Sequence, residues 1–313
     1  MKKYRPEGSK AEKTSTKSRV HPPITLSFLE RAKEKRLILD APVLLCDQAL
    51  SLHIALGDFI GIIPKEEAAF SPSGLPIKDI AILTRVGKTV SFFVKEIKRS
   101  VFGHPEITLS RRELQKECYE QYVSGVRPGD VIPAKVTHIE SFGAFLDVGC
   151  GINALLPIDA ISISRISHPR YRFSVGDEFS VVVQSIDEEG RIYVSRKELL
   201  GTWEENAAFF LPGQTVSGIV RSIESYGIFI ELTPNLTGLA EYKEGVRENE
   251  IAAVYIKSMI PERMKIKLII IDSHKEHAHT AKLFFPTDEH PRHIDYWRYS
   301  PPCATKRIES DFS

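Results

Sequence analysis

The chain has 313 residues, of which 42% are hydrophobic and 27% are charged, and its net charge at pH 7 is +1. This composition is typical of a soluble protein of two or three domains, and the near-neutral charge argues against a general polyanion-binding surface. No apolar run reaches membrane-spanning length and no apolar segment follows the basic start, so we expect a cytoplasmic protein without a membrane partner. The four cysteines are scattered, which predicts free thiols and neither a disulfide framework nor a zinc site.

The first 36 residues are basic, with eleven Lys or Arg against four Glu. Because Lys, Ser, Thr and Pro dominate 1–24, we expect 1–36 to be a basic, largely disordered arm, with helical spacing only from residue 27 onwards. From 37 to 112 apolar and polar residues alternate, which predicts a first strand-rich domain. This domain ends in the sequence SRREL at 110–114.

A sequence repeat organises the rest of the chain. The segment 128–157 aligns without a gap on 212–241, and the copies contain the related stretches IESFGAFLDV and IESYGIFIEL. A repeat of this kind predicts one structural unit per copy. SRREL returns as SRKEL at 195–199, so we interpret the first domain as a diverged third copy. We therefore expect related domains at 37–112, 128–198 and 212–271, joined by short helices, and a C-terminal extension at 272–313.

Each repeated domain has the pattern of five short antiparallel strands, which predicts a small closed barrel. Gly143 and Gly227 recur in the middle of a strand pair, where a strand that bends around a small barrel has no room for a side chain. An aromatic residue precedes each glycine and another follows two positions after it. Their odd spacing would put them on opposite faces of a regular strand, so we expect a bulge at the glycine that brings both to one face.

The second domain resembles the S-one (S1) domain. The residues that carry the resemblance are V-x-x-I-x-x-F-G-A-F-L-D-V-G…A-L-L-P, then ISISRISHP and VGDEFSVVVQSID…GRIYVSRKEL. The S1 domain is the RNA-binding oligonucleotide-binding (OB) module repeated in the largest protein of the bacterial small ribosomal subunit. The resemblance covers the second domain fully, the third over its first half and the first more weakly. It implies an all-β-dominated chain of tandem five-stranded OB barrels joined by short helices, with flexible termini.

The same resemblance implies a site for RNA. In this family two aromatic side chains on the barrel stack on bases, and Phe142 and Phe145 match that pair. Asp187 and Arg191 match an acidic and a basic position between the last two strands. The histidine position of the family falls on Pro157, so one contact of the family is missing. The alternative readings are that one aromatic belongs to the core and that Arg191 is an ordinary turn residue.

The long loop SRISHPRYRF offers replacements for the missing contact. Its His168, Arg170 and Arg172 are interleaved with aromatic residues, and single-stranded RNA is bound by cations on its phosphates and flat rings on its bases. We therefore place these three residues at the RNA site. The alternative for His168 is a residue that caps the loop. The segment 128–198 has seven Lys or Arg against ten Asp or Glu, so a nucleic-acid site in it must be local.

The third domain keeps the aromatic pair as Tyr226 and Phe229, which makes a second candidate RNA face. Glu241 stands where the family has its histidine, and the basic loop is shortened, so we expect this face to lack a positive rim. Packing between domains is the competing interpretation of the pair. In the C-terminal extension, Tyr296, Trp297 and Tyr299 are too apolar for a free tail, which predicts that the extension docks on a domain.

Taken together, these features predict a non-catalytic protein that binds single-stranded RNA, either mRNA or rRNA, and acts with translation, with the small ribosomal subunit as a candidate partner. We find no nucleophile elbow, phosphate-cradling loop or paired-carboxylate motif, so we expect no enzyme activity and no cofactor. His274, His277 and His279 lie close in sequence but have no cysteine partners, and we expect no metal site. Two other functions remain open: an accessory protein in RNA decay or regulation, and a protein-interaction scaffold built on OB folds.

Overall fold

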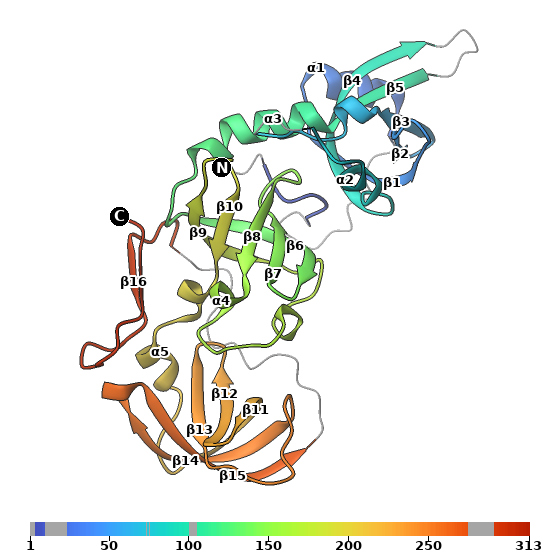
Figure 1. The fold of residues 1–313 in the computed structure, drawn as a ribbon. Coiled ribbons are helices and arrows are strands. Elements are labelled where there is room, and N and C mark those ends of the chain that lie inside the picture. The colour runs from blue at the N-terminus through green and yellow to red at the C-terminus, as the bar shows by residue number, and fades with distance from the viewer. Residues whose placement is uncertain (1–3, 10–23, 73, 75, 100–104, 275–290) are drawn as a thin grey trace. The chain divides into compact units, whose positions relative to one another are not determined.

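Strands dominate the computed structural model, which describes all residues except 1–3, 10–23, 73, 75, 100–104 and 275–290. In the described part of the chain the strands form three closed five-stranded barrels and one two-stranded sheet (Figure 1). The predicted fold class of tandem five-stranded barrels joined by short helices is therefore confirmed. No helix among the described residues is both long enough and apolar enough to cross a membrane. His277 and His279 lie outside the described residues.

The first barrel has the strand order β1-β2-β3-β5-β4. Leu29 and Ala32 of the preceding helix α1 belong to its buried core, which explains the helical spacing seen in the sequence. The short helix α2 contributes Ile82 to the same core. The bounds of these elements are α1 Leu26–Glu34, β1 Leu39–Cys46, β2 Leu52–Leu56, β3 Phe59–Ile63, α2 Asp79–Leu83, β4 Thr89–Arg99 and β5 Pro105–Ser110.

The second barrel has the order β10-β8-β7-β6-β9. A long loop that contains the short helix α4 and a turn of 3-10 helix at Pro169–Tyr171 connects β8 to β9. The helix α3 precedes the barrel, with Ser110 as its N-cap: the Ser110 hydroxyl accepts a hydrogen bond from the Glu113 amide. The bounds are α3 Arg111–Gln121, β6 Val131–Glu140, β7 Gly143–Asp147, β8 Asn153–Pro157, α4 Ile158–Ile161, β9 Glu178–Ile186 and β10 Ile192–Ser195.

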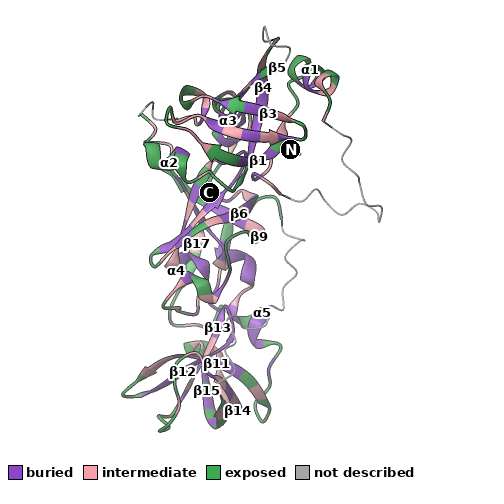
Figure 2. Ribbon diagram, turned by 90° about the vertical axis from the view of Figure 1, so that its right-hand side faces the viewer, coloured by how far each residue is buried: buried purple, intermediate pink, exposed green. Residues whose placement is uncertain are grey.

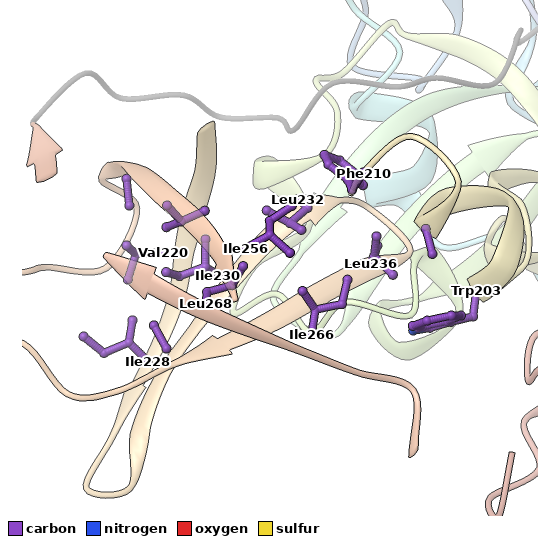
Figure 3. Close-up of a cluster of buried hydrophobic side chains, with 14 of the residues drawn as sticks. Trp203, Phe210, Val220, Ile228, Ile230, Leu232, Leu236, Ile256, Ile266 and Leu268 are labelled. Carbon is purple, nitrogen blue, oxygen red and sulfur yellow. The ribbon is translucent and has the colours of Figure 1, made fainter. Parts of the chain in front are cut away.

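The third barrel has the order β11-β12-β13-β15-β14. Apolar side chains from its strands meet Trp203 of the preceding helix α5 in one core (Figure 3). Trp297 of the C-terminal extension belongs to the same cluster. The prediction that the extension docks on a domain is confirmed at Trp297 and Tyr299, which are buried in this core, whereas Tyr296 is exposed. The bounds are α5 Trp203–Ala207, β11 Thr215–Glu224, β12 Gly227–Thr233, β13 Leu236–Ala240, β14 Ile251–Ile260, β15 Lys265–His274, β16 Tyr296–Arg298 and β17 Glu309–Asp311.

The chain divides into two compact units. One holds residues 1–126 with the turn segments 147–153 and 188–190, and the other holds the remaining residues. Most of the second barrel and the whole third barrel thus belong to one unit.

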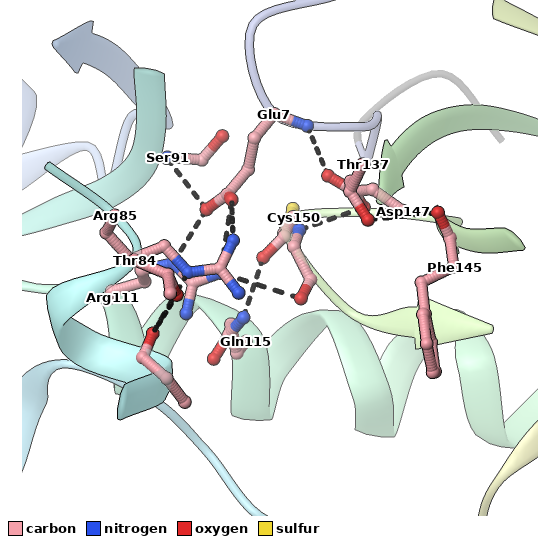
Figure 4. Close-up of polar contacts among 12 residues, drawn as sticks. Glu7, Thr84, Arg85, Ser91, Arg111, Gln115, Thr137, Phe145, Asp147 and Cys150 are labelled. Atoms are coloured by element: carbon pink, nitrogen blue, oxygen red, sulfur yellow. Dashed lines mark hydrogen bonds and ion pairs between the residues drawn. The ribbon is translucent and has the colours of Figure 1, made fainter. Parts of the chain in front are cut away.

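A buried polar cluster in the first unit involves the start of the chain (Figure 4). The Glu7 carboxylate accepts hydrogen bonds from Arg111, 2.7 Å from Nε, while the Glu7 amide donates to Asp147 at 2.6 Å. Asp147 also accepts from the Gly149 and Gly151 amides. The predicted basic arm is therefore ordered at Glu7, which is buried as the partner of a buried arginine.

Candidate nucleic-acid interface

Two aromatic side chains stand on the outside of the second barrel. Phe142 lies in the turn between β6 and β7 and is 54% exposed, and Phe145 is half-buried at an outward position of β7. Their ring centroids are 6.1 Å apart and the planes meet at 88°, an edge-to-face pair. The structure thus brings together the two rings that the sequence predicted to stack on bases. The exposure of Phe142 excludes it from the core.

Gly143, next to Phe142, lies where the neighbouring strand β8 approaches closely. A Cβ atom at this position would lie 2.4 Å from the carbonyl oxygen of Leu156, so a side chain cannot be accommodated where β8 passes. In the third barrel the corresponding Gly227 would place its Cβ 2.5 Å from the Ala240 oxygen. The predicted lack of room for a side chain at both glycines is confirmed, and its cause is the close approach of a neighbouring strand.

The predicted bulge at the glycine is wrong in the third barrel. Gly227 pairs regularly with Glu224, and the register shifts between Val220 and Ser222 of the neighbouring strand β11. Tyr226 lies in the hairpin turn before β12. Because Tyr226 is outside the strand, the alternation of faces does not apply to it, and no bulge is needed for both rings to be exposed on one side.

A third ring, His138, was missed by the sequence reasoning. It is exposed on β6 and stacks beside Phe145, with centroids 6.4 Å apart and an interplanar angle of 25°. Its Nε2 lies 2.6 Å from Glu140 Oε1. The sequence comparison looked for a histidine at Pro157, the family position. The hairpin register would have found it, because the repeat aligns His138 with Ser222, which pairs with Phe229.

Asp187 and Arg191 flank the turn between β9 and β10. The Arg191 amide donates to Asp187 Oδ1 at 2.8 Å, and the Asp187 amide donates to the Arg191 oxygen at 3.0 Å. The Arg191 guanidinium is exposed and lies 3.6 Å from Asp187 Oδ2. Asp187 therefore shapes the turn, and Arg191 presents a cation to solvent from it.

His168 and Arg170 lie on the long loop between β8 and β9. The His168 Nδ1 accepts a hydrogen bond from the Arg170 amide at 3.2 Å, so His168 caps the short 3-10 turn that follows it. This is the alternative role considered for His168 in the sequence. The Arg170 side chain is exposed.

Arg172 has a different position from the one expected. Its side chain is 2% exposed and forms two hydrogen bonds with Glu231 of β12, Nη2 to Oε2 at 2.6 Å and Nη1 to Oε1 at 2.9 Å. Arg221 of β11 binds the same carboxylate, Nε to Oε2 at 2.8 Å. Burial lowers the pKa of Arg172, and the Glu231 carboxylate opposes that effect. The assignment of Arg172 to the RNA site is therefore corrected, since its guanidinium is occupied inside the protein.

The third barrel repeats the aromatic pair. Tyr226 is 68% exposed, Phe229 is half-buried, and their rings meet edge to face with centroids 6.1 Å apart at 87°.

The first barrel differs at the equivalent strands: His53 of β2 pairs across to Leu45 and Ile62, and both of these are exposed aliphatic residues. No cluster of three or more His, Cys, Asp or Glu that could hold a metal occurs in the described part of the chain.

Comparison with known proteins finds a family match for the second barrel. Residues 126–197 match the model of the S1 RNA binding domain. The chain is 27% identical over 221 residues to "Small ribosomal subunit protein bS1 homolog" of Bacillus subtilis, which covers 68% of this chain and 56% of that protein. It is also 27% identical over 206 residues to "Small ribosomal subunit protein bS1" of Staphylococcus aureus, covering 64% of this chain and 51% of that protein.

Among solved structures, the solution structure of GSP13 from Bacillus subtilis is 31% identical over 22% of this chain and 55% of that chain, with a TM-score of 0.22. The present chain spans about half the length of the curated relatives it matches. The resemblance read from the sequence is confirmed for the second barrel, since residues 126–197 match the model of the S1 RNA binding domain.

Proposed function

We propose that the chain is a non-catalytic protein that binds single-stranded RNA through the second barrel and acts in translation. The observation that carries this proposal is the edge-to-face pair of the exposed Phe142 and the half-buried Phe145 on a barrel that matches the S1 RNA binding domain. Flat rings on an OB barrel serve as stacking platforms, and each stacked base contributes about 1–3 kcal/mol. Stacking needs an unpaired base, so the expected ligand is a single strand.

Cations at the edge of this surface complement the rings. Arg170 and Arg191 are exposed, and each would meet a phosphate of the bound strand. His138 extends the platform beside Phe145. Asp187 holds the turn from which Arg191 projects, so it acts on RNA through the position of that arginine. His168 has the same kind of role for Arg170.

The link to translation rests on the relatives. Two of the matched proteins are small ribosomal subunit proteins by name, and the match extends over about two thirds of this chain. We therefore propose the small ribosomal subunit as the partner and mRNA or rRNA as the ligand, which places the protein in the cytoplasm.

Two measurements test this function. Fluorescence anisotropy compares a pyrimidine-rich single strand of about ten nucleotides with the same strand in a duplex, and we expect the single strand to bind at least about tenfold more tightly. Equal affinity for both would contradict recognition by stacking. Sedimentation of a cell extract then shows whether the protein sediments together with the small ribosomal subunit, as we expect. If the protein co-purifies with ribonucleases and is absent from the small subunit, the role in RNA decay is favoured. If the protein binds neither the single strand nor the duplex, the protein-interaction scaffold is favoured.

A further inference from the structure

Two cysteine thiols meet in the interior of the first unit. Cys118 is on α3, Cys150 lies in the turn between β7 and β8, and both side chains are buried. A Cβ atom on Gly149, the residue before Cys150, would lie 3.3 Å from the Cys118 sulfur, so the turn packs directly on this thiol. The Cys150 thiol forms a hydrogen bond with Cys118, and this contact, followed by burial, raises the pKa of Cys150. The two sulfur atoms are therefore direct neighbours, although they belong to different elements.

The helix α3 presents one buried face to this turn. Buried residues recur along the helix at Arg111, Leu114, Gln115 and Cys118, which is the spacing of a single helical face (Figure 2). The Gln115 side-chain amide donates to the Cys150 oxygen at 3.0 Å, less than one turn before Cys118 (Figure 4). The same face of α3 thus holds the Cys150 backbone and meets its thiol.

The backbone of Cys150 is held in a conformation that its side chain disfavours. Its φ is 49°, in the left-handed region that favours glycine. The Cys150 amide donates to the Arg5 oxygen at 2.7 Å, and Asp147 accepts from the amides of Gly149 and Gly151 on either side. Backbone strain that surrounding contacts impose in this way clusters at functional positions. A cysteine placed there, against a second buried cysteine, points to a role for the thiol itself.

We propose that Cys118 and Cys150 form a reversible redox switch, which closes to a disulfide when a hydroperoxide oxidises the pair. One S–S bond forms while the two S–H bonds and the peroxide O–O bond break. The two electrons and two protons of the thiols pass to the peroxide, which leaves as two molecules of water, or as water and an alcohol. A dithiol reductant reverses the step by thiol–disulfide exchange. In a reducing compartment disulfides of this kind are transient and serve redox sensing.

The disulfide would join parts of the chain that carry different barrels. The helix α3 begins directly after β5 of the first barrel, and the turn connects β7 to β8 of the second. Oxidation therefore adds a covalent tie between the two barrels, which the reduced chain lacks. At rest the pair is protected, because buried, protonated thiols react slowly. Local opening of the N-terminal segment, which binds the Cys150 amide through the Arg5 oxygen, gives the oxidant access.

Mass spectrometry of the full chain tests this switch. The reduced protein is exposed to hydrogen peroxide at neutral pH, its remaining thiols are alkylated under denaturing conditions, and the digest is analysed without reduction. We expect a cross-linked peptide pair that contains Cys118 and Cys150 and is lighter by two hydrogens than the two separate thiol peptides. Alkylation of these two cysteines should be lost together and return together after treatment with a dithiol reductant.

Cys303→Ser is the matched control, because Cys303 is an exposed thiol of the C-terminal extension, and this variant should form the same cross-link. Cys118→Ser should leave Cys150 without a cross-link. The wild-type map and Cys303→Ser decide the question by themselves if Cys118→Ser does not fold.

Three results would overturn the switch. In the first, Cys118 and Cys150 are both still alkylated after an exposure that oxidises Cys303 completely. In the second, either one becomes a sulfinic or sulfonic acid in place of the cross-link. In the third, either one pairs with Cys46 or Cys303. The outcome is independent of the proposed RNA binding, since no measurement in the test involves RNA.

Discussion

The Arg172 guanidinium lies 2.6 Å from the Glu231 carboxylate, and neither side chain has more than 2% of its surface exposed. Glu231 also accepts hydrogen bonds from Arg221, so two buried arginines share one buried carboxylate. Buried ions are tolerated only when paired, because removing a charge from water costs several kcal/mol. The basic loop between β8 and β9 is therefore a structural connection to the third barrel at Arg172, although Arg170, two residues earlier, is exposed.

Replacing the shared carboxylate should destabilise the protein strongly. Glu231→Gln keeps the size of the side chain but leaves Arg172 and Arg221 without a counter-charge, and breaking such a pair costs about 3–5 kcal/mol. Urea unfolding followed by tryptophan fluorescence measures the loss. The control is Glu248→Gln, an exposed residue of the loop before β14, which should change the stability by no more than about 0.5 kcal/mol. Equal stability of both variants would contradict the role of Glu231.

The glycine of the repeated stretch should be sensitive to a single methyl group. Gly143→Ala would place Cβ 2.4 Å from a backbone oxygen, and overpacking of this kind costs about 1–3 kcal/mol. Gly125→Ala is the matched control, since a Cβ there meets nothing within 4 Å. Thermal unfolding of the two variants should show a lower midpoint for Gly143→Ala only. If both midpoints equal that of the wild type, β8 does not constrain this position.

The stability of the first unit should depend on pH through Asp147. Burial, and secondly the charge of Glu7, raise the pKa of Asp147 from 3.8 to about 7. A carboxyl group whose pKa is higher in the folded than in the unfolded state binds its proton preferentially when folded. Its contribution to stability is therefore greatest below about pH 4, falls as the pH rises to about 7 and is constant above that.

Asp147→Asn tests this dependence, because asparagine does not titrate. The variant should lose part of the decrease in unfolding midpoint that the wild type shows between about pH 4 and pH 7. Differential scanning calorimetry across that range gives the two curves. Parallel curves for wild type and variant would show that Asp147 does not change its protonation in this window.

The fold could be predicted from the sequence to the extent that it depends on short-range pattern. The alternation of strands, the repeat and the two glycines specify small barrels, because each reflects contacts between neighbouring strands. Phe142 could be assigned to the surface for the same reason: it falls in the hairpin turn. Arg172 could not be placed, because its partner Glu231 lies on another barrel and nothing in the local sequence indicates a buried carboxylate at that distance along the chain.

The positive charge on the third barrel was also missed in the sequence. The repeat ends before β14 and β15, where the exposed lysines Lys257, Lys265 and Lys267 lie, so these lysines had no counterpart in the second domain to indicate their position. His138 was missed because a family position was searched in place of the strand pairing. Both errors concern residues that lie on a different strand from the aromatic pair.

The salt dependence of RNA binding should report only a few phosphates at the second barrel. Each phosphate neutralised on a single strand contributes about −0.7 to the slope of log affinity against log salt concentration. Arg191→Ala should therefore weaken binding of a pyrimidine-rich single strand of about ten nucleotides and reduce the slope by about 0.7. The control is Lys116→Ala on α3, an exposed cation of the helix before the barrel, which should leave the slope unchanged. An unchanged slope in Arg191→Ala would exclude a phosphate contact at this residue.

The most direct measurement is the affinity of Phe142→Ala for a pyrimidine-rich single strand of about ten nucleotides, by fluorescence anisotropy beside the wild type. Phe142 is exposed and outside the core, so its removal should leave the fold intact, which circular dichroism verifies. If bases stack on this ring, the loss should be about 1–3 kcal/mol, which is roughly ten- to a hundredfold in affinity at the second barrel. An affinity equal to that of the wild type would mean that the repeated aromatic-Gly-x-aromatic stretch serves the architecture of the barrel and that RNA does not bind there.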